Sequence, residues 1–302
     1  MPTPEHLAEQ FEAHRAHLRA VAYRMLGSPS EADDAVQESW IRLGRTDVSR
    51  VENLRAWLTT VVARVSLDML RTRTSRREDS LDEHVERAEH AVHVPDPVIA
   101  RADANPETDA MIADSVGLAL LVVLETLEPA ERLAFVLHDV FGMPFDEIAP
   151  IVDRSVEAAR QLASRARRRV QGQAPTSDTD LREQRRVVDA FLAAAREGDF
   201  ERLVAVLDPD IVLRADGGAA KGMSRFVRGA QQVAAQAATF SKMGLSSQVI
   251  LVNGNIGVMS RLPDGRLFSV AGLTVAGGKI VEMDILADPD RLARLDLSAL
   301  DR

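Results

Sequence analysis

The pattern of hydrophobic and polar positions divides the chain into three parts, of which the first is helical. From about residue 4 to residue 77, apolar residues recur at spacings of three, four and seven, which is the period of amphipathic helices. The stretch GSPSEADD ends one helix and begins the next, and a third helix begins near Val51. The pattern predicts a compact three-helix unit over residues 1–77.

A polar and acidic stretch separates this unit from a second helical part. Residues 78–107 contain the prolines of VPDP and NPE, which are typical of a linker. Helical periodicity returns over residues 108–170 in four shorter helices, one of which begins at the proline of LEPAERLAFVLHDV. Residues 171–180, QGQAPTSDTD, form a second polar linker. We expect two small all-helical modules joined by a flexible tether.

The third part, residues 181–302, changes from helical periodicity to alternation. Two helices in LREQRRVVDAFLAAAREGDFERLVAVL, the strand DIVLRAD and another helix precede a run of alternating segments from about residue 246. The turns NGN, PDG and AGGK between these segments are typical of hairpins, so an antiparallel sheet is expected. The chain is therefore expected to be multidomain, with two all-α domains followed by an α+β domain whose sheet curls over a helix.

The stretch FDEIAPIVDRSVEAARQLASRARRRV has the pattern of a helix-turn-helix. A short helix over residues 145–152 is followed by the turn DRS and by a second helix beginning at Ser155, whose hydroxyl can accept from a first-turn amide. The second helix of such a motif enters the DNA major groove, where Arg160 and Gln161 are expected to reach base edges while the other arginines hold phosphates. The alternative is a solvated basic face on an ordinary amphipathic helix. The candidate DNA contacts are Ser155, Glu157, Arg160, Gln161, Ser164, Arg165 and Arg168.

The placement of charge favours DNA contact at two places on an otherwise acidic chain. The formal net charge is -9, yet basic side chains concentrate at residues 64–77 and 154–169. The chain has no cysteine, which excludes disulfides, thiolate metal sites and thiol nucleophiles. It has no apolar run of membrane-spanning length and no signal-peptide pattern, so we expect a cytoplasmic protein without membrane contact.

Two segments together resemble RNA polymerase sigma factors of the extracytoplasmic-function group, the minimal kind with only regions 2 and 4. SEADDAVQESWIRL and ENLRAWLTTVVARVSLDMLRTRTSRRE are similar to region 2, and LETLEPAERLAFVLHDVFGMPFDEIAPIVDRSVEAARQLASRARRRV is similar to region 4 throughout. The resemblance implies an alternative sigma factor that directs promoter-specific transcription initiation. Its implied partners are promoter DNA and core RNA polymerase, bound through the beta-prime clamp and the beta flap.

The resemblance also implies roles for particular residues. Region 4 would read the -35 element through the helix-turn-helix, and region 2 would melt and read the -10 element with a base pocket near residues 48–53. Arg64 stands where some members have asparagine. The residues implied in polymerase docking are Asp33, Asp34, Gln37 and Glu38. Those implied at the -10 element are Asn53, Arg64, Asp68, Arg71 and Arg73.

The part beyond residue 181 is similar to the cone-shaped SnoaL-like fold, also called the nuclear-transport-factor-2-like fold. A sigma subgroup carries this domain together with three short signatures, whose counterparts here are HVPDP at 93–97, DGGAAK at 216–221 and DPDRL at 288–292. All three depart from the subgroup pattern. The resemblance implies a regulatory domain that sets how the two DNA-binding units sit, with a cavity for a small molecule and with dimerisation through its sheet. The expected interdomain contacts are Pro95, Asp96, Pro97, Asp216, Gly217, Gly218, Lys221, Asp288, Pro289 and Asp290.

Two other functions compete with this interpretation. A stand-alone helix-turn-helix regulator with a ligand-sensing domain explains residues 145–302 but gives no role to SEADDAVQESWIRL. A cone-fold isomerase or cyclase would need an Asp, His or Tyr for proton transfer, and residues 181–302 contain no His or Tyr. Asp216 or Asp284 would have to act alone as a base. We therefore expect no catalytic residue, no cofactor and no metal site.

Overall fold

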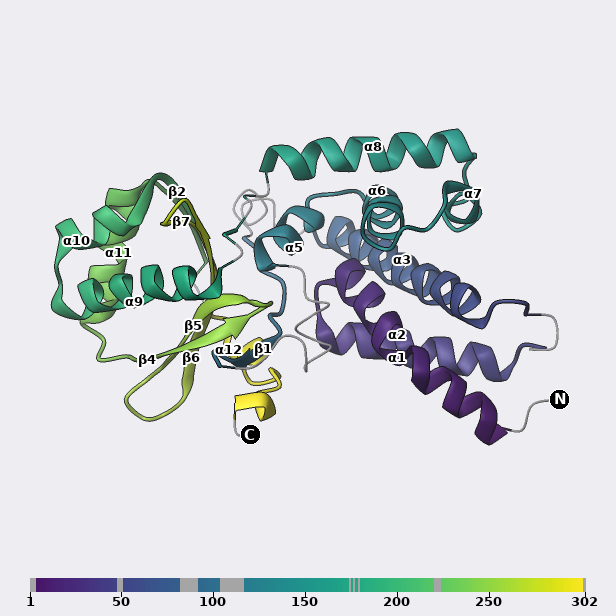
Figure 1. Ribbon diagram of the computed structural model, residues 1–302, viewed down its shortest axis with the longest axis horizontal. Helices are drawn as coiled ribbons and strands as arrows, with labels where there is room; N and C mark the ends of the chain where they lie inside the picture. Colours follow the sequence, from purple (N-terminus) through teal and green to yellow (C-terminus); the bar gives the residue numbers. More distant parts are fainter. Residues whose placement is uncertain are drawn as a thin grey trace. The chain divides into compact units, whose positions relative to one another are not determined.

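The described residues form two compact units. The computed structural model describes residues 4–47, 51–81, 92–103, 117–173, 175, 177–178, 180–219 and 224–300. The helical unit comprises Met1–Val85 and Val123–Gln173, and the sheet unit comprises Glu86–Val122 and Ala174–Arg302. Each unit is shown in Figure 1, with the helical unit mostly in purple and teal and the sheet unit mostly in green and yellow.

Three long helices form the first part of the helical unit, as the sequence predicts. Gly27, with φ of 73°, ends the first helix, and Pro29 stands at the start of the second, where a missing amide costs nothing. The side chain of Asn53 caps the third helix by accepting from the amide of Ala56 at 3.1 Å. The helices are α1 (Pro4–Leu26), α2 (Pro29–Gly44) and α3 (Leu54–Leu81).

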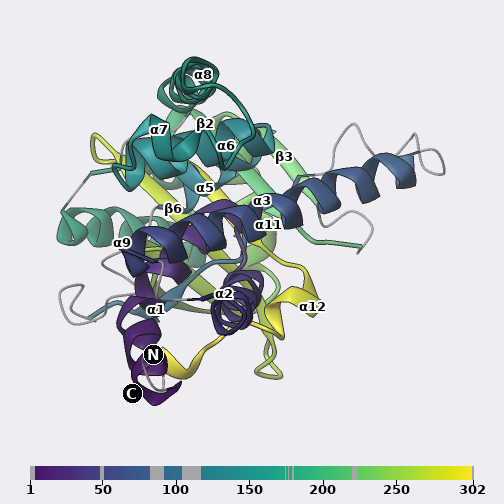
Figure 2. The same ribbon diagram turned by 90° about the vertical axis from the view of Figure 1, so that its right-hand side faces the viewer.

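Shorter helices follow from residue 117 onwards, within the range that the sequence assigns to the second helical part. Helix α8 packs along α6, and Figure 2 shows α8 nearly end-on above α6 and α7. The buried side chains of Leu133 and Leu137 supply much of the apolar contact of this part. The elements are α5 (Leu118–Glu125), α6 (Pro129–Phe135), the π-helical turn η3 (Val136–Val140), α7 (Phe145–Ile148) and α8 (Val156–Gln173).

The two helical parts pack against each other, so the expectation of flexibly tethered modules is wrong for this structure. Helix α6 contacts α3, and η3 contacts α1. Arg132 of α6 is 3% exposed and donates its Nε to the carbonyl oxygen of Arg24 in α1 at 3.1 Å. The ring of Phe141 meets His17 edge-on at 5.3 Å. The reason is that α6 and η3 carry apolar residues on more than one face, and these gain stability by burial.

The sheet unit contains one curved sheet with the strand order β1-β4-β5-β6-β7-β2-β3 among the described residues. Neighbouring strands are antiparallel except β2 and β7, which are parallel. Asn253, with φ of 50°, and Gly254 form the tight turn between β4 and β5. The strands are β1 (Ile99–Arg101), β2 (Leu207–Asp216), β3 (Arg225–Arg228), β4 (Ser246–Val252), β5 (Asn255–Arg261), β6 (Leu267–Ala276) and β7 (Lys279–Leu286).

Helices cover one face of this sheet. Helices α9 (Leu181–Glu197) and α11 (Ala230–Ser241) lie against it in Figure 1, and the short α10 (Phe200–Val206) packs on both helices. Asp180 and Asp199 cap α9 and α10 through their side chains. Two short elements end the described chain, α12 (Pro289–Leu292) and the 3-10 turn η4 (Ser298–Leu300).

The predicted linker at residues 78–107 is only partly a linker, because some of it belongs to the sheet unit. Strand β1 pairs antiparallel with β4, with Ile99 opposite Val252. The amide of Asn253 donates to the carbonyl oxygen of Val98 at 2.8 Å, and the Asn253 side chain accepts from the Val98 amide at 3.0 Å. The apolar side chains of Val94 and Ile99 are buried. A segment that the polar pattern assigns to a tether is therefore the edge strand of the sheet.

Candidate nucleic-acid interface and regulatory contacts

Helices α7 and α8 form the predicted helix-turn-helix. Asp153, with φ of 55°, lies in the turn that reverses the chain between them. The buried side chains of Ile148, Val152 and Ala159 pack the two helices together. The hydroxyl of Ser155 accepts from the amide of Ala158 at 3.2 Å, which is the cap that the sequence predicts.

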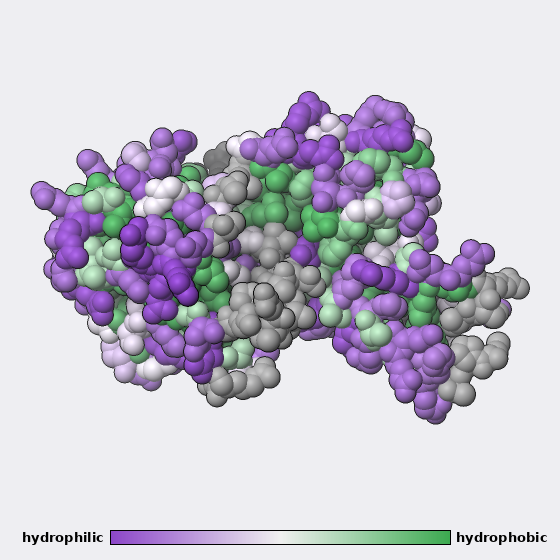
Figure 3. Space-filling view, viewed as in Figure 1, coloured by the Kyte–Doolittle hydropathy of each residue, from purple (hydrophilic) through white to green (hydrophobic). Residues whose placement is uncertain are grey.

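One face of α8 carries polar side chains that are exposed in the structure. Their spacings of three, four, seven and eleven place them on one side of a helix. Arg160 lies 5.9 Å from the ring centre of Phe145 and 3.6 Å from Glu157, which hold its guanidinium near the start of the helix. Figure 3 shows hydrophilic side chains gathered over α8 at the top of the view. The exposed residues of this face, here called the α8 face, are Glu157, Arg160, Gln161, Ser164 and Arg168.

The other arginines of α8 are held by carboxylates of neighbouring elements. Arg165 donates to Glu131 at 2.8 Å, and Arg169 donates to the same carboxylate at 3.1 Å. Arg167 lies 2.6 Å from Asp139. The side chain of Glu131 is only 7% exposed, so its charge is stabilised by these partners. Arg165, predicted as a DNA contact, thus pairs with a carboxylate of α6 although its side chain is 51% exposed, and the basic strip divides into arginines held by neighbouring elements and the α8 face.

The residues implied in polymerase docking lie together on α2. Asp33, Asp34 and Gln37 are exposed, and Glu38 is half-exposed. Asp33 accepts from Arg19 at 2.7 Å, and Glu38 accepts from Arg42 at 2.9 Å, both near the surface. Such exposed pairs contribute at most about 1 kcal/mol, so a partner protein can replace them at little cost.

An apolar residue next to this acidic group was missed by the sequence reasoning. Ile41 is 40% exposed, and it follows Gln37 and Glu38 on α2 by four and three residues, so it lies on the same side of the helix. The sequence does indicate that Ile41 is exposed, because helical spacing places it off the face of α2 that carries the buried Val36 and Leu43. Ile41 therefore adds one exposed apolar side chain beside the acidic group of α2.

The residues implied at the -10 element divide between an exposed face and internal roles. Arg64, Asp68 and Arg71 are exposed on one face of α3, but Arg64 also donates to the carbonyl oxygen of Pro150 at 3.0 Å. Arg73 turns towards α2, where it pairs with Glu31. Asn53 is exposed and caps α3. Residues 48–50 of the predicted base pocket lie outside the described residues.

Three segments far apart in the sequence meet in the sheet unit. The carboxylate of Asp216 at the end of β2 accepts from the amide of Val94 at 3.0 Å and lies 2.6 Å from the guanidinium of Arg291. Arg291 also lies 2.6 Å from Asp96 and donates to the carbonyl oxygen of Val94. We call Val94, Asp96, Asp216 and Arg291 the linker node. The node joins the predicted segments HVPDP, DGGAAK and DPDRL through specific side chains.

Arg291 was not among the expected interdomain contacts, although it lies within DPDRL. Its side chain is 12% exposed and is surrounded by two carboxylates and a carbonyl group. The sequence contains one indication of its role. Arg291 is the basic residue of DPDRL, and HVPDP and DGGAAK each contain an aspartate with which it can pair. The sequence instead predicts contacts at Asp288, Pro289 and Asp290, of which Pro289 and Asp290 are exposed.

The remaining expected contacts shape the backbone around the node. Pro95 and Pro97 are buried. The amide of Gly217 donates to the hydroxyl of Ser224 at 3.1 Å. Gly218 has φ of 59°, and a Cβ atom there would lie 2.0 Å from the carboxylate of Asp288. Asp288 caps α12 by accepting from backbone amides. Lys221 lies outside the described residues.

The carboxyl group of Asp216 is ionised at neutral pH despite being only 4% exposed. Burial raises its pKa, but His93, the amides of Val94 and Gly218 and the charge of Arg291 together outweigh burial and lower the pKa to about 2. The linker node is therefore a buried contact with several charge-assisted hydrogen bonds, which are stronger than hydrogen bonds between neutral groups.

A second charged cluster lies nearby on β2 and β7. Arg214 donates to Asp284 at 3.0 Å and to Glu282 at 3.2 Å. Burial raises the pKa of Asp284 to about 6, even though Arg214 opposes the change. Among the residues that the structure describes, no group of three or more His, Asp or Glu side chains could hold a metal ion. Both acids considered as bases, Asp216 and Asp284, are engaged by arginines.

A helix-turn-helix with an exposed polar face, joined to a second helical part with a basic helix, defines a DNA-binding protein of transcription. Comparison with known proteins refines this class. The model of Sigma-70 region 2 matches residues 10–76, and that of Sigma-70 region 4 matches residues 117–170. Together with the relatives described next, these matches show that the chain belongs to the extracytoplasmic-function (ECF) family of RNA polymerase sigma factors.

Two relatives from Mycobacterium tuberculosis extend the match over nearly the whole chain. The ECF RNA polymerase sigma factor SigJ is 38% identical and covers 93% of this chain, with 92% of its own length matched. The probable ECF RNA polymerase sigma factor SigI is 34% identical, with 93% of each chain covered. The crystal structure of SigJ matches with a TM-score of 0.73 at 33% identity, covering 96% of this chain and 99% of that one.

These findings confirm the predicted family and the predicted order of two all-α sigma regions followed by an α+β domain. A stand-alone regulator would give no role to SEADDAVQESWIRL, whereas the family match assigns this segment to Sigma-70 region 2. No helix in the described part of the chain is long and apolar enough to cross a membrane.

Proposed function

We propose that this sigma factor reads the -35 promoter element through the α8 face. The observation that supports this is the position of Arg160 and Gln161, exposed near the start of the second helix of a helix-turn-helix. In this motif the first turns of the second helix contact base edges in the major groove. Arg168, two turns further along, is placed to hold a phosphate, because it too is exposed on this face.

Transcription with core RNA polymerase tests the α8 face. Promoters are first selected from a random library with the wild-type holoenzyme. Replacing Arg160 or Gln161 by Ala should cost about 1–3 kcal/mol, which is about a 5- to 150-fold loss of promoter affinity. Arg228→Ala is the control, because Arg228 is an equally charged side chain of the sheet unit that is 67% exposed. Equal effects of Arg160→Ala and Arg228→Ala would reject the assignment.

The acidic face of α2 docks on core polymerase in this proposal. Asp33, Asp34, Gln37 and Glu38 present acceptors to the basic groups of the beta-prime clamp, and Ile41 adds an apolar contact. Region 4 binds the beta flap. A pull-down with core polymerase should lose at least about tenfold in affinity for Ile41→Asp, because this change buries an unpaired charge at the interface.

Arg64, Asp68 and Arg71 contact the single-stranded -10 element in this proposal, together with the loop that precedes Asn53. In the described structure, however, Arg64 lies against Pro150 of the helix-turn-helix. The -10 and -35 elements are about 25 base pairs apart, or roughly 85 Å at about 3.4 Å per base pair. One compact unit cannot reach both, so regions 2 and 4 separate when the promoter is bound.

Arg132 favours this separation. Its guanidinium is 3% exposed, and its Nη2 has no hydrogen-bond partner among the described residues. Burial lowers its pKa to about 10, so the group remains charged at neutral pH. A buried charge with an unsatisfied donor is costly, and separating α6 from α1 would return it to water.

The sheet unit modulates activity by holding the segment between regions 2 and 4. The linker node and strand β1 fix residues 94–101 to the sheet, which restricts how far the two regions can separate. Arg291→Ala removes the guanidinium that bridges Asp96 and Asp216, so this segment is released and transcription from the selected promoters should rise. Arg294→Ala, an exposed arginine three residues further along the chain, is the matched control. Unchanged or lower transcription by Arg291→Ala would contradict this mode of regulation.

The sheet unit acts as a binding domain and not as an enzyme. Asp216 and Asp284 are paired with arginines, and the alternation of β2 and β7 turns both acids away from the cavity that Leu213 and Met283 line. We infer that this cavity holds a small molecule. Because the chain works on promoter DNA with core polymerase, we place it in the cytoplasm.

A homodimer formed through the sheet unit is part of the proposal. Strand β3 is an edge of the sheet, and its Phe226 is 58% exposed. Exposed aromatic residues on an edge strand are suited to pairing with a second copy. Light scattering should give a dimer mass for the wild type and a monomer mass for Phe226→Glu. A monomeric wild type would reject the dimer.

A further inference from the structure

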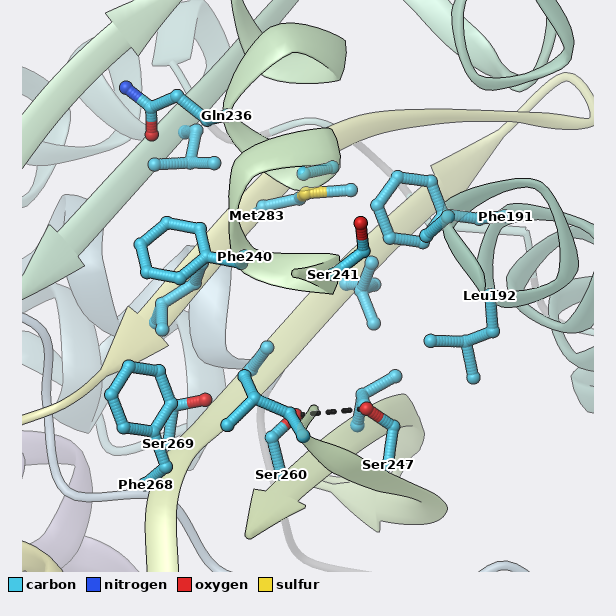
Figure 4. A pocket seen from close by; sticks show the side chains of 18 of the residues that line it. Phe191, Leu192, Gln236, Phe240, Ser241, Ser247, Ser260, Phe268, Ser269 and Met283 are labelled. Carbon is cyan, nitrogen blue, oxygen red and sulfur yellow. Dashed lines mark hydrogen bonds between the residues drawn. The ribbon is translucent and has the colours of Figure 1, made fainter. Parts of the chain in front are cut away.

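The sheet unit contains a cavity of about 640 Å³ between the sheet and helices α9 and α11 (Figure 4). This volume lies in the range of sites that enclose drug-sized ligands. Its walls come from both helices and from strands β2, β4, β5, β6 and β7, so the cavity is built into the fold of one unit.

The walls of the cavity are mainly apolar and aromatic. Phe191 of α9, Phe240 of α11 and Phe268 of β6 surround the space with Leu192 and Met283, as Figure 4 shows. The ring centres of Phe240 and Phe268 are 6.1 Å apart and tilted by 53°. Aromatic and aliphatic groups in this arrangement favour a ligand with a hydrocarbon or aromatic body.

Uncharged hydroxyl groups line the cavity on β4, β5 and β6, where Ser247 is exposed and Ser260 and Ser269 are buried. Ser247 and Ser260 face each other with their hydroxyl oxygens 3.2 Å apart, and Ser269 lies on the neighbouring strand (Figure 4). When one serine of the pair donates to the other, one hydroxyl proton remains for an oxygen atom of a ligand. The pair therefore fits a carbonyl or hydroxyl oxygen.

Charged lining residues lie at the solvent-exposed side. Arg185, Asp189, Arg196 and Arg225 are all exposed, and Arg185 and Asp189 pair at 3.0 Å along α9. A charged group carried past these residues, into the part of the cavity lined by Phe191, Phe240 and Met283, would lose its hydration among apolar side chains, which is unfavourable by several kcal/mol. The interior therefore selects uncharged ligands.

The strands separate this cavity from the acids of the sheet. Leu213 and Ala215 of β2 line the cavity, and the alternating side chains Arg214 and Asp216 lie on the opposite face. Asp189 is the carboxylate among the described lining residues, and it is paired with an arginine. A ligand inside meets no free acid or base, so the site is suited to binding without chemical conversion.

We propose that this cavity binds an uncharged, largely hydrocarbon or aromatic small molecule that carries a carbonyl or hydroxyl oxygen bound by Ser247 and Ser260. This inference rests on the proposed binding role of the sheet unit and names its ligand class. It is independent of the promoter contacts of α8.

Fluorescence titration of the full chain with Nile red, an uncharged aromatic dye with a carbonyl group, tests the ligand class. The wild type should give saturable binding at one site per chain. Ala237→Phe places a ring from α11 into the cavity and should weaken binding about tenfold or more. Ala235→Phe adds the same ring at an exposed position of the same helix and should bind like the wild type. The double variant Ser247→Ala and Ser260→Ala should weaken binding about 2- to 10-fold.

Other results would overturn the proposal in distinguishable ways. Absence of saturable binding by the wild type would reject both the ligand class and the binding role of the cavity. Tighter binding of an anionic dye, such as 8-anilinonaphthalene-1-sulfonate, would reject the uncharged class and leave the binding role. Equal weakening by Ala237→Phe and Ala235→Phe would place the dye elsewhere. If circular dichroism shows that Ala237→Phe is unfolded, Ser269→Phe fills the cavity from β6 in its place.

Discussion

Replacing Asp216 by Asn should weaken the linker node selectively. The substitution keeps the size of the side chain and removes its charge. Among the described residues, Arg291 then retains Asp96 as a charged partner. The Val94 amide and the guanidinium share one oxygen of Asp216 and the Gly218 amide uses the other, so Asn, with one acceptor oxygen, cannot satisfy both sides. The buried contact between DPDRL and HVPDP is therefore lost in part, without a cavity in the core.

The magnitude follows from the pKa of Asp216. An ordinary aspartate has a value of 3.8, and the folded protein lowers it to about 2. Because each pKa unit corresponds to about 1.4 kcal/mol, the ionised form stabilises the fold by about 2 kcal/mol at neutral pH. The residue is almost fully buried, so solvent screens little of this contribution. Asp216→Asn should lower the free energy of unfolding of the sheet unit by about 2–3 kcal/mol.

Amide hydrogen exchange gives the local readout. The amide of Val94 donates to Asp216, so its exchange should accelerate about 30-fold when about 2 kcal/mol of local stability is lost. The matched control is Asp290→Asn, which removes the same charge from an exposed aspartate of DPDRL. The reasoning would be refuted if the exchange rate of the Val94 amide were unchanged in Asp216→Asn. It would also be refuted if Asp290→Asn accelerated this exchange to the same extent.

The pH dependence has a definite sign. Since folding lowers the pKa of Asp216, its contribution is fully present above about pH 4 and is lost as the pH falls towards 2. The difference in stability between the wild type and Asp216→Asn should therefore shrink as the pH is lowered from 6 to 3. A constant difference over this range would show that the carboxylate charge is not what stabilises the node.

Three further predictions concern packing and charge. Gly257→Ala should destabilise the sheet unit by at least about 1–3 kcal/mol in urea titration, because the new Cβ would lie 2.5 Å from the side chain of Val252. Burial raises the pKa of Asp284 to about 6 beside Arg214. The free energy of unfolding of the wild type should therefore rise by up to about 3 kcal/mol as the pH falls from 7 to 4. Thermal unfolding of Asp284→Asn over the same pH range should not show this rise. Glu131→Gln removes the carboxylate shared by two arginines of α8 and should lower the melting temperature of the helical unit, whereas Glu128→Gln, an exposed glutamate, should not.

The sequence predicts elements well where the signal is local. The helices follow from apolar spacing, and the cap at Ser155 follows from residue type, because both depend on neighbours within a few positions. Strand β1 has only three residues, Ile99–Arg101, and its pairing with β4 depends on residues about 150 positions away. No local pattern distinguishes such a segment from an extended linker, so the boundary at residues 78–107 was misplaced.

The candidate site shows the same division between local and distant causes. The α8 face is visible from helical spacing, since Arg160, Gln161 and Arg168 share one side. Arg165 follows Gln161 by four residues and shares this side by spacing, and only the packing of α6 shows that it pairs with Glu131. Arg291 likewise gains its meaning from two carboxylates that are distant in sequence. Sequence patterns thus identify the segments that matter, whereas the partner of each charge depends on tertiary structure.

This pairing explains how a basic strip works in a protein with a net charge of -9. Glu131 and Asp139 offset the charges of Arg165, Arg167 and Arg169, so these partly exposed arginines offer less positive charge to DNA than an unpaired strip would. Non-specific DNA affinity grows with the number of phosphates that a protein neutralises, and these pairs reduce the charge that α8 offers for that purpose. A sigma factor delivered to DNA by core polymerase needs its helix to select a site, and a small, shaped set of charges selects better than a continuous cationic surface.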